Sequence, residues 1–230
     1  MKKLDIFISG EVMNLCIPTE KFAREAKWYF WFNNPKITRY LDQGMFPNTP
    51  EDQAEFFLSQ KPNRLMLIIS NKKEYMGIIS LSKINLIKKI CHIAMVLDKS
   101  VDKELSFYIS LEAMAKLTEH AFNVMGINRI EAGQHVELKG WQQRLELIGY
   151  KLEGLHKNKF VKGNEVSASV SISCLYDDFK NIVKHRGSLW DSKENMKKRY
   201  NQLPQKAFVD MLNNFFEQER ANYYKQIFLL

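Results

Sequence analysis

Residues 166–174 constrain the fold more than any other stretch, because they alternate strictly between apolar and polar side chains. Apolar residues occupy the even positions from 166 to 174, and serines occupy the odd positions between them. This period of two predicts a β-strand with one buried and one wetter face. Three more strand candidates lie close together at 64–70, 75–82 and 91–97. A short polar turn at 71–74 joins the first two, so we expect an antiparallel meander.

The period then changes to that of a helix. Apolar residues recur every three or four positions at 111, 114, 115, 121, 122 and 125, with Thr118 on the same face, and Gly126 stands where a helix C-cap belongs. Strands at 128–134 and 150–155 are predicted to enclose a helix around 137–148. Alternating strands and helices predict an α/β (α+β) fold with a mixed central sheet.

Two upstream segments, 19–32 and 50–60, are also predicted to be helical. The second has a strong start signal, with Thr49 as N-cap, Pro50 at the first position and acidic residues in the first turn.

The pattern changes again after residue 176, where no further strand is expected. We therefore predict one α/β domain at 1–176 and a helical C-terminal extension at 177–230. Phe208, Leu212, Phe215 and Phe216 are spaced for one helix face. That face either packs on the domain or mediates a homodimer; a membrane-surface helix is less favoured, because the polar face is not strongly basic.

The charge of the chain indicates which class of ligand it binds, and its cysteines indicate the compartment. The net charge is +8, but only eight of the 34 basic residues are Arg and the lysines are spread along the chain. This argues against nucleic-acid binding and favours anionic small molecules such as nucleotides. No apolar run approaches the length of a membrane span. The three cysteines, Cys16, Cys91 and Cys174, lie among apolar residues, and no signal peptide is recognised, so we expect free thiols in a cytoplasmic protein.

Residues 122–133, FNVMGINRIEAG, resemble the core of the GCN5-related N-acetyltransferase (GNAT) superfamily. The resemblance continues in HVELK at 135–139 and LELIGYKLEG at 145–154, and it begins upstream with MGIISL at 76–81 and TPEDQ at 49–53. It is closest to the branch of ribosomal-protein N-terminal and amino-sugar N-acetyltransferases. It covers about residues 9–175 and leaves the extension out.

The resemblance implies a sheet of about seven strands with flanking helices, and an acyl transfer from acetyl-CoA or another acyl-CoA to a primary amine. It implies no metal. In this fold the pantetheine arm lies between the splayed fourth and fifth strands, and the third helix presents its N-terminal amides to the pyrophosphate. The residues that the resemblance assigns to the donor are Met95, Val96, Leu97, Lys103, Ser106, Phe107, Tyr108 and Leu138.

The chain departs from the family at the pyrophosphate loop, where both family glycines are missing. Ser106 and Tyr108 occupy their places, and Leu138 stands where the family has Asn. Glycines let backbone amides approach a phosphate closely, so Phe107 and Tyr108 are expected to crowd that approach. Two alternatives follow: the donor still binds through helix amides, Ser106 and Lys103, or the fold has lost CoA and serves as a binding scaffold.

His92 is the catalytic candidate, because it stands where an acidic residue often begins the fourth strand of this branch. A histidine titrating near neutral pH suits a general base; the alternative is a strand histidine on a solvent face. His135 matches a family histidine at the end of the fifth strand. The family's general-acid tyrosine would fall at Leu145, so it is absent, and Tyr150 is predicted to be a core aromatic.

The acceptor site is expected around residues 28–41, which are rich in aromatic side chains. Most of these aromatics are predicted to be core, which leaves Asn33, Arg39 and Tyr40, together with His135, as substrate-binding candidates. The favoured hypothesis is an N-acyltransferase acting on a small amine, best a nucleotide-linked amino sugar of surface-polysaccharide biosynthesis. The alternatives are a protein N-terminal acetyltransferase and a non-catalytic binding module.

Overall fold

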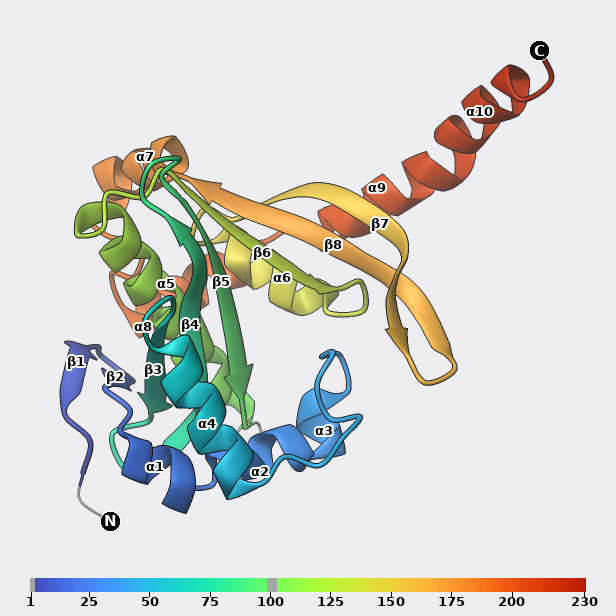
Figure 1. Ribbon diagram of the computed structural model, residues 1–230. Helices are drawn as coiled ribbons and strands as arrows, with labels where there is room; N and C mark the ends of the chain where they lie inside the picture. The colour runs from blue at the N-terminus through green and yellow to red at the C-terminus, as the bar shows by residue number, and fades with distance from the viewer. Residues whose placement is uncertain (1–2, 99–102) are drawn as a thin grey trace.

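The computed structural model describes residues 3–98 and 103–230, apart from the side chains of Lys103 and Glu104. In this part of the chain, eight strands form one mixed sheet in the order β1-β2-β3-β4-β5-β6-β8-β7 (Figure 1). The mixed sheet with flanking helices confirms the expected fold class, and two short N-terminal strands were not foreseen. The strands are β1 (Ile6–Ser9), β2 (Asn14–Cys16), β3 (Leu65–Ser70), β4 (Tyr75–Asn85), β5 (Ile90–Leu97), β6 (Arg129–His135), β7 (Lys151–Lys162) and β8 (Glu165–Leu175).

Helices cover both faces of the sheet and bury two separate cores. One face carries α1 (Glu20–Glu25), α2 (Trp28–Asn33), α3 (Pro35–Thr38) and α4 (Pro50–Gln60), and the other carries α5 (Lys103–Asn123), α6 (Lys139–Glu146) and α7 (Tyr176–Arg186). β3 serves both cores, because successive side chains of a strand point to opposite faces. Met66 and Ile68 pack with α1, α2 and α4, whereas Leu67 and Ile69 pack with α5.

Local signals set several element ends as expected. The Thr49 hydroxyl accepts the backbone N–H of Asp52 at 3.1 Å, and the Asp52 carboxylate accepts the N–H of Thr49 at 2.9 Å, which forms a capping box at the start of α4. Gly126 ends the α5 region at φ +67°, a conformation that favours glycine. The single helix predicted at 19–32 is instead broken into α1 and α2, because Ala26 adopts an extended backbone.

β5 and β6 are parallel neighbours along only three residues. The pairs are Ile90 with Arg129, Cys91 with Ile130, and His92 with Glu131. Beyond them, β5 continues to Leu97 paired with β4 alone, and β6 continues to His135 paired with β8 alone. The two strands therefore diverge immediately after His92.

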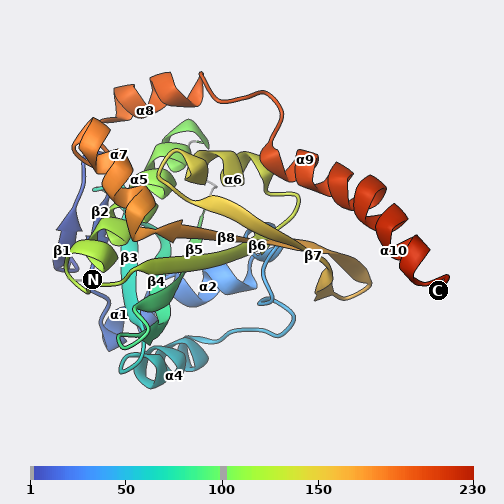
Figure 2. The same ribbon diagram turned by 90° about the horizontal axis from the view of Figure 1, so that it is seen from above.

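The extension begins as part of the main body and ends as a projecting helix. Trp190, Met196 and Val209 are buried in the larger core, and the indole N–H of Trp190 donates to Glu11 at 2.9 Å. The later helices, running from 208 to 227, project from the body to the C-terminus (Figures 1 and 2).

No helix among the described residues is long and apolar enough to cross a membrane. The domain boundary at 176/177 stays a prediction. The elements of the extension beyond α7 are α8 (Lys193–Tyr200), α9 (Phe208–Phe215), a π-helical turn η1 (Phe216–Arg220) and α10 (Ala221–Ile227).

A substitution of Gly77 tests how tightly β4 must approach β5. A Cβ atom at Gly77 would lie 2.2 Å from the carbonyl oxygen of Val96 and 2.9 Å from Cα of Leu97. Both are backbone atoms, so the strands must separate to relieve the clash. We expect Gly77→Ala to lower the free energy of unfolding by about 1–3 kcal/mol, the usual cost of overpacking, as measured by urea denaturation.

Gly140→Ala is the matched control, because nothing lies within 4 Å of a Cβ at Gly140 in α6. That variant should unfold at the urea concentration of the wild type or above it. Equal midpoints for Gly77→Ala and the wild type would contradict the close approach.

Candidate active site

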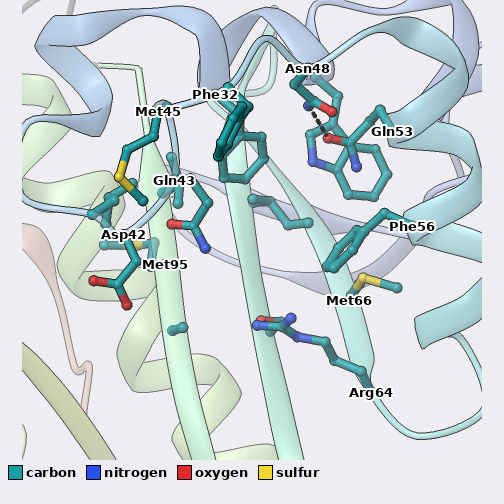
Figure 3. Close-up of a pocket in the computed structure, with 18 of the residues that line it drawn as sticks. Phe32, Asp42, Gln43, Met45, Asn48, Gln53, Phe56, Arg64, Met66 and Met95 are labelled. Atoms are coloured by element: carbon teal, nitrogen blue, oxygen red, sulfur yellow. Dashed lines mark hydrogen bonds between the residues drawn. The ribbon is translucent and has the colours of Figure 1, made fainter. Parts of the chain in front are cut away.

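A pocket of about 380 Å³ opens on the sheet face that carries α1–α4 (Figure 3). Its floor is formed by β3, β4 and the diverging part of β5, through Met66, Ile78, Ser80, Ala94 and Val96. Its walls are α2, α4 and the loop at 41–48, here called the acceptor loop. The wall side chains are mostly apolar and include Trp28, Phe32, Met45, Phe46 and Phe56. The pocket therefore lies beside the point at which β5 leaves β6.

Asn33 holds the acceptor loop in place. Its amide nitrogen donates to the carbonyl of Asn48 at 2.7 Å, and its amide oxygen accepts the backbone N–H of Asn48 at 2.7 Å. The Asn48 side chain in turn donates to Gln53 of α4 at 3.0 Å (Figure 3). Asn33 was predicted to bind substrate, and here both ends of its amide are engaged by the loop backbone.

His135 and Tyr40 join the start of the acceptor loop to the β7–β8 hairpin. Their rings stack at a centroid distance of 4.4 Å, and Phe160 of β7 meets His135 edge-on at 4.6 Å. His135 is buried, and its Nε2 lies 2.6 Å from the Ser167 hydroxyl. Arg39 is exposed, with its guanidinium 5.1 Å from the Tyr40 ring centroid. These three predicted substrate residues form one cluster, and none of them lines the pocket.

A lysine from the β7–β8 hairpin also holds the start of the acceptor loop, through hydrogen bonds to its backbone. The ammonium of Lys162 donates to the carbonyls of Thr38, Leu41 and Gln43 at 2.6, 3.1 and 2.7 Å. The Thr38 carbonyl, at the end of α3, also accepts the backbone N–H of Leu41 at 2.9 Å, so the ammonium reinforces a turn that the backbone already forms. The conformation of the acceptor loop therefore depends on a hairpin that is distant in the sequence.

His92 lies on the pocket face of β5, two residues before Ala94. Its Nε2 is 2.9 Å from a carboxylate oxygen of Glu131 on β6. Glu131 also accepts from Nε of Arg129 at 2.7 Å, and Arg129 pairs with Glu153 of β7. Partial burial lowers the pKa of His92 from its usual value, the positive charge of Lys83 lowers it further, and Glu131 opposes both. His92 is thus held by a carboxylate yet remains mostly neutral at neutral pH.

The predicted donor residues of β5 lie along an edge with no strand partner. Past His92, β5 has β4 on one side and no paired strand among the described residues on the other. Its outer backbone N–H and C=O groups are free to pair with an amide-containing chain laid beside it. Met95 and Val96 also line the pocket, whereas Leu97 is buried in the larger core.

A comparison of the sequence with protein-family models assigns the family. Residues 20–151, more than half of the chain, match the family model of the acetyltransferase (GNAT) domain. The chain belongs to the GNAT acetyltransferase family. It is therefore an acyl-CoA-dependent N-acetyltransferase, as the resemblance implied. Among the curated proteins, none matches the sequence significantly.

Solved GNAT structures share the fold at low sequence identity. RimL, a ribosomal L7/L12 α-N-protein acetyltransferase in complex with coenzyme A, is 18% identical with a TM-score of 0.65 and covers 76% of this chain and 99% of its own. The microcin C7 self-immunity acetyltransferase MccE, in complex with acetyl-CoA and AMP, is 22% identical with a TM-score of 0.60, covering 72% and 93%. Mycobacterium smegmatis RimJ, in complex with CoA-disulfide, is 14% identical with a TM-score of 0.62, covering 76% and 90%.

Ser106, Phe107 and Tyr108, which the resemblance placed in the pyrophosphate loop, instead lie in the first turns of α5. Ser106 is buried, and its hydroxyl has no hydrogen-bond partner in the part of the chain that the structure describes. Phe107 and Tyr108 are also buried, against Tyr200 and Trp190 of the extension. The side chain of Lys103 lies outside the described residues. Leu138 is half-buried at the N-cap of α6.

Several pocket residues escaped the sequence analysis. Residues 28–41 were predicted to border the acceptor, and the pocket wall extends past them to Asn48. Arg64 was read as the first residue of a strand, and Phe56 as an interior residue of the helix at 50–60. The exposed apolar pair Met45 and Phe46, beside Gly44 at φ +86°, was the available signal, because such a turn with two large apolar side chains suggests a binding loop. The cores were foreseen correctly: Trp28, Trp31, Tyr150 and all three cysteines are buried.

Two neighbours of His92 should move the pH profile in opposite directions. If neutral His92 accepts the proton of the amine, kcat/KM falls as the pH drops through the pKa of His92, which lies below about 6.5. Glu131→Gln removes a carboxylate that raises this pKa, so the acid limb should shift to lower pH. Lys83→Met removes a charge that lowers it, so the limb should shift to higher pH.

The acceptor is the same in every assay, so its own titration contributes equally to all three profiles. Identical acid limbs for the wild type and both variants would show that His92 does not control the rate.

Proposed function

We propose that this GNAT acetyltransferase acetylates the primary amine of a small acceptor, a nucleotide-linked amino sugar used in surface-polysaccharide biosynthesis. The pocket beside the β5–β6 divergence carries the proposal. Its volume of about 380 Å³ falls in the range of small-molecule sites and its lining is mostly aromatic or aliphatic. Ala94, Met95 and Val96 border both the pocket and the free edge of β5, so an acceptor held there meets a donor held along that edge.

The rim of the pocket suits a nucleotide. Met45 and Phe46 are 59% and 83% exposed, and Phe56 is 39% exposed beside them. Flat apolar side chains at a pocket mouth stack on a base or a sugar face. MccE, which shares the fold, was solved with AMP as well as acetyl-CoA. We assign the enzyme to the cytoplasm, which the three free buried cysteines support.

His92 serves as the general base in this proposal. The attacking amine must lose a proton, and a neutral imidazole on the pocket face takes it directly or through one water. The carboxylate of Glu131 stabilises the imidazolium that forms, because the two groups are 2.9 Å apart. Within the described residues, no tyrosine stands at the family's general-acid position, which Leu145 occupies in the core.

A protein N-terminus is the second acceptor to test, because RimL and RimJ have this fold. The acceptor loop roofs the pocket from 41 to 48 and is fastened by Asn33 and Lys162. An extended peptide needs an open groove, so the roofed pocket favours a small acceptor.

The test combines donor titration with an acceptor panel. Calorimetry with acetyl-CoA and CoA should show binding, and steady-state assays should compare a UDP-linked amino sugar, the free amino sugar and an N-terminal peptide. We expect the nucleotide-linked sugar to have the highest kcat/KM. His92→Ala should lower kcat by about 10²–10⁴-fold while donor affinity stays near that of the wild type.

A preference for the peptide would transfer the assignment to protein N-terminal acetylation. Absence of binding at millimolar acetyl-CoA would leave a binding scaffold as the remaining function. An unchanged kcat in His92→Ala would remove His92 from the mechanism.

We further propose that the protein forms a homodimer through its C-terminal helix. Large apolar side chains form an exposed stripe along residues 208–230, ranging from 40% exposed upward: Phe208, Met211, Phe215, Tyr223, Ile227 and Leu230. Their spacings of three, four, eight, four and three residues read the same in both directions. An antiparallel second copy would therefore match Phe208 with Leu230, Met211 with Ile227 and Phe215 with Tyr223. Two-fold symmetry requires such a self-complementary surface.

The π-helical turn at 216–220 supports this pairing. It adds a residue to one helical turn, so Tyr223 returns to the face of Phe215 eight residues earlier. We expect Phe215→Glu to convert a dimer to a monomer in sedimentation equilibrium, because it places a charge at the centre of the stripe. Asn214→Glu, one residue away on an exposed polar face, should stay dimeric. A wild-type monomer would contradict the proposal.

A further inference from the structure

Arg64 introduces a positive charge into a largely apolar pocket. Of the charged side chains that line the pocket among the described residues, Arg64 is the cation and Asp42 the anion. Arg64 extends from the start of β3 across the floor, while Asp42 lies beside Met95 on another side (Figure 3). The two do not form an ion pair, so the charge of Arg64 is not cancelled within the pocket.

The surroundings of Arg64 fix its orientation and leave one edge of the guanidinium free. Nε donates to the hydroxyl of Ser80 at 3.1 Å, and the guanidinium carbon lies 5.9 Å from the ring centroid of Phe56. No carboxylate in the described part of the chain lies within 4 Å of its terminal nitrogens. Burial without a counter-ion lowers the pKa of Arg64. A half-buried guanidinium is costly unless an anion pairs with it.

The position of Ser80 relates Arg64 to the proposed base. Ser80 pairs with Ala94 on β5, and the next residue on the same face of β5 is His92, which pairs with Ser82. Two residues along a strand span about 7 Å, and neighbouring strands are about 4.8 Å apart. By these spacings the backbone of Ser80, which holds Arg64, and that of His92 lie about 8 Å apart on the same face of the sheet, with His92 just outside the residues that line the pocket.

We propose that Arg64 binds an oxyanion group of the amine acceptor, a phosphate or a carboxylate, and thereby makes the enzyme selective for anionic acceptors. The two terminal nitrogens present parallel N–H groups, which match two oxygens of either group. The bound oxyanion then places the amine of the same molecule near His92. This inference rests on the proposed function, because it specifies the acceptor of that reaction.

The test measures selectivity rather than activity alone. With acetyl-CoA saturating, kcat/KM is compared for glucosamine, glucosamine 6-phosphate and muramic acid, which carry no added anion, a phosphate and a carboxylate. The wild type should prefer at least one anionic acceptor over glucosamine. Arg64→Met should reduce that preference by about 10–100-fold, as expected for loss of a charge-assisted hydrogen-bonded pair. Arg64→Lys should retain part of it.

Lys61→Met is the matched control, because it removes the same charge from an exposed position at the end of α4. Its preference should equal that of the wild type. Equal preference in the wild type and Arg64→Met would overturn the inference, as would a wild type without any preference for the anionic acceptors. The anionic acceptor whose kcat/KM falls more in Arg64→Met carries the group that Arg64 binds.

A binding measurement separates this inference from the proposed function. Calorimetry compares AMP with adenosine, which differ only by the phosphate. If the wild type acetylates none of the sugars, the proposed acceptor class fails, but an affinity advantage of AMP that disappears in Arg64→Met still supports the oxyanion site. Equal affinity of AMP for both proteins, together with no sugar acetylation, would overturn it.

Discussion

The structure depends on how briefly β5 pairs with β6. Three residue pairs hold the strands together, and the last of them, His92 with Glu131, places the base candidate at the branch point. Within the described part of the chain, the residues of β5 after His92 have one unpaired backbone edge, and one face of this segment forms part of the pocket floor. β5 keeps its course only because β4 supports it from the other side, with Gly77 allowing the backbone of Val96 and Leu97 to come close. The pairing of β4 with β5 therefore both stabilises the sheet and sets the geometry of the pocket floor.

The acceptor side is built differently, from a loop fastened by distant residues. Asn33 secures its far end, and Lys162 and the Tyr40–His135 stack secure its near end. Asn33, Tyr40 and His135, which were predicted to bind substrate, hold this loop in place, and their role in binding stays a prediction. The loop over the pocket and the strands beneath it are therefore held in place by different parts of the chain.

Periodicity predicted most of the fold, because it reports on local backbone preference and on which face is buried. It identified β8, β3–β5, both ends of α4 and the C-terminal end of α5, but it missed the start of α5, whose first turns had been read as a loop. It missed β1 and β2, which are short and are held by long-range contacts: the buried carboxylate of Glu112 accepts the backbone N–H groups of Glu11, Val12 and Met13. Arg64 was missed for the same reason, since its isolation from carboxylates is a property of the folded pocket. His92 was singled out because the family resemblance fixes its place on a strand, and its catalytic role stays a prediction.

The extension explains how the start of α5 can carry large side chains, because it packs against them. Phe107 and Tyr108 would obstruct a phosphate if their rings lay over the helix N-terminus. Instead, Phe107 packs on Tyr200 with Arg144 4.2 Å above its ring, and Tyr108 packs on Trp190 with Lys193 5.0 Å away. Burial of two such side chains contributes about 1.5–3 kcal/mol each. The extension thus gives Tyr108 a place at a position where the resemblance implies glycine, and the start of α5 and the extension pack against each other.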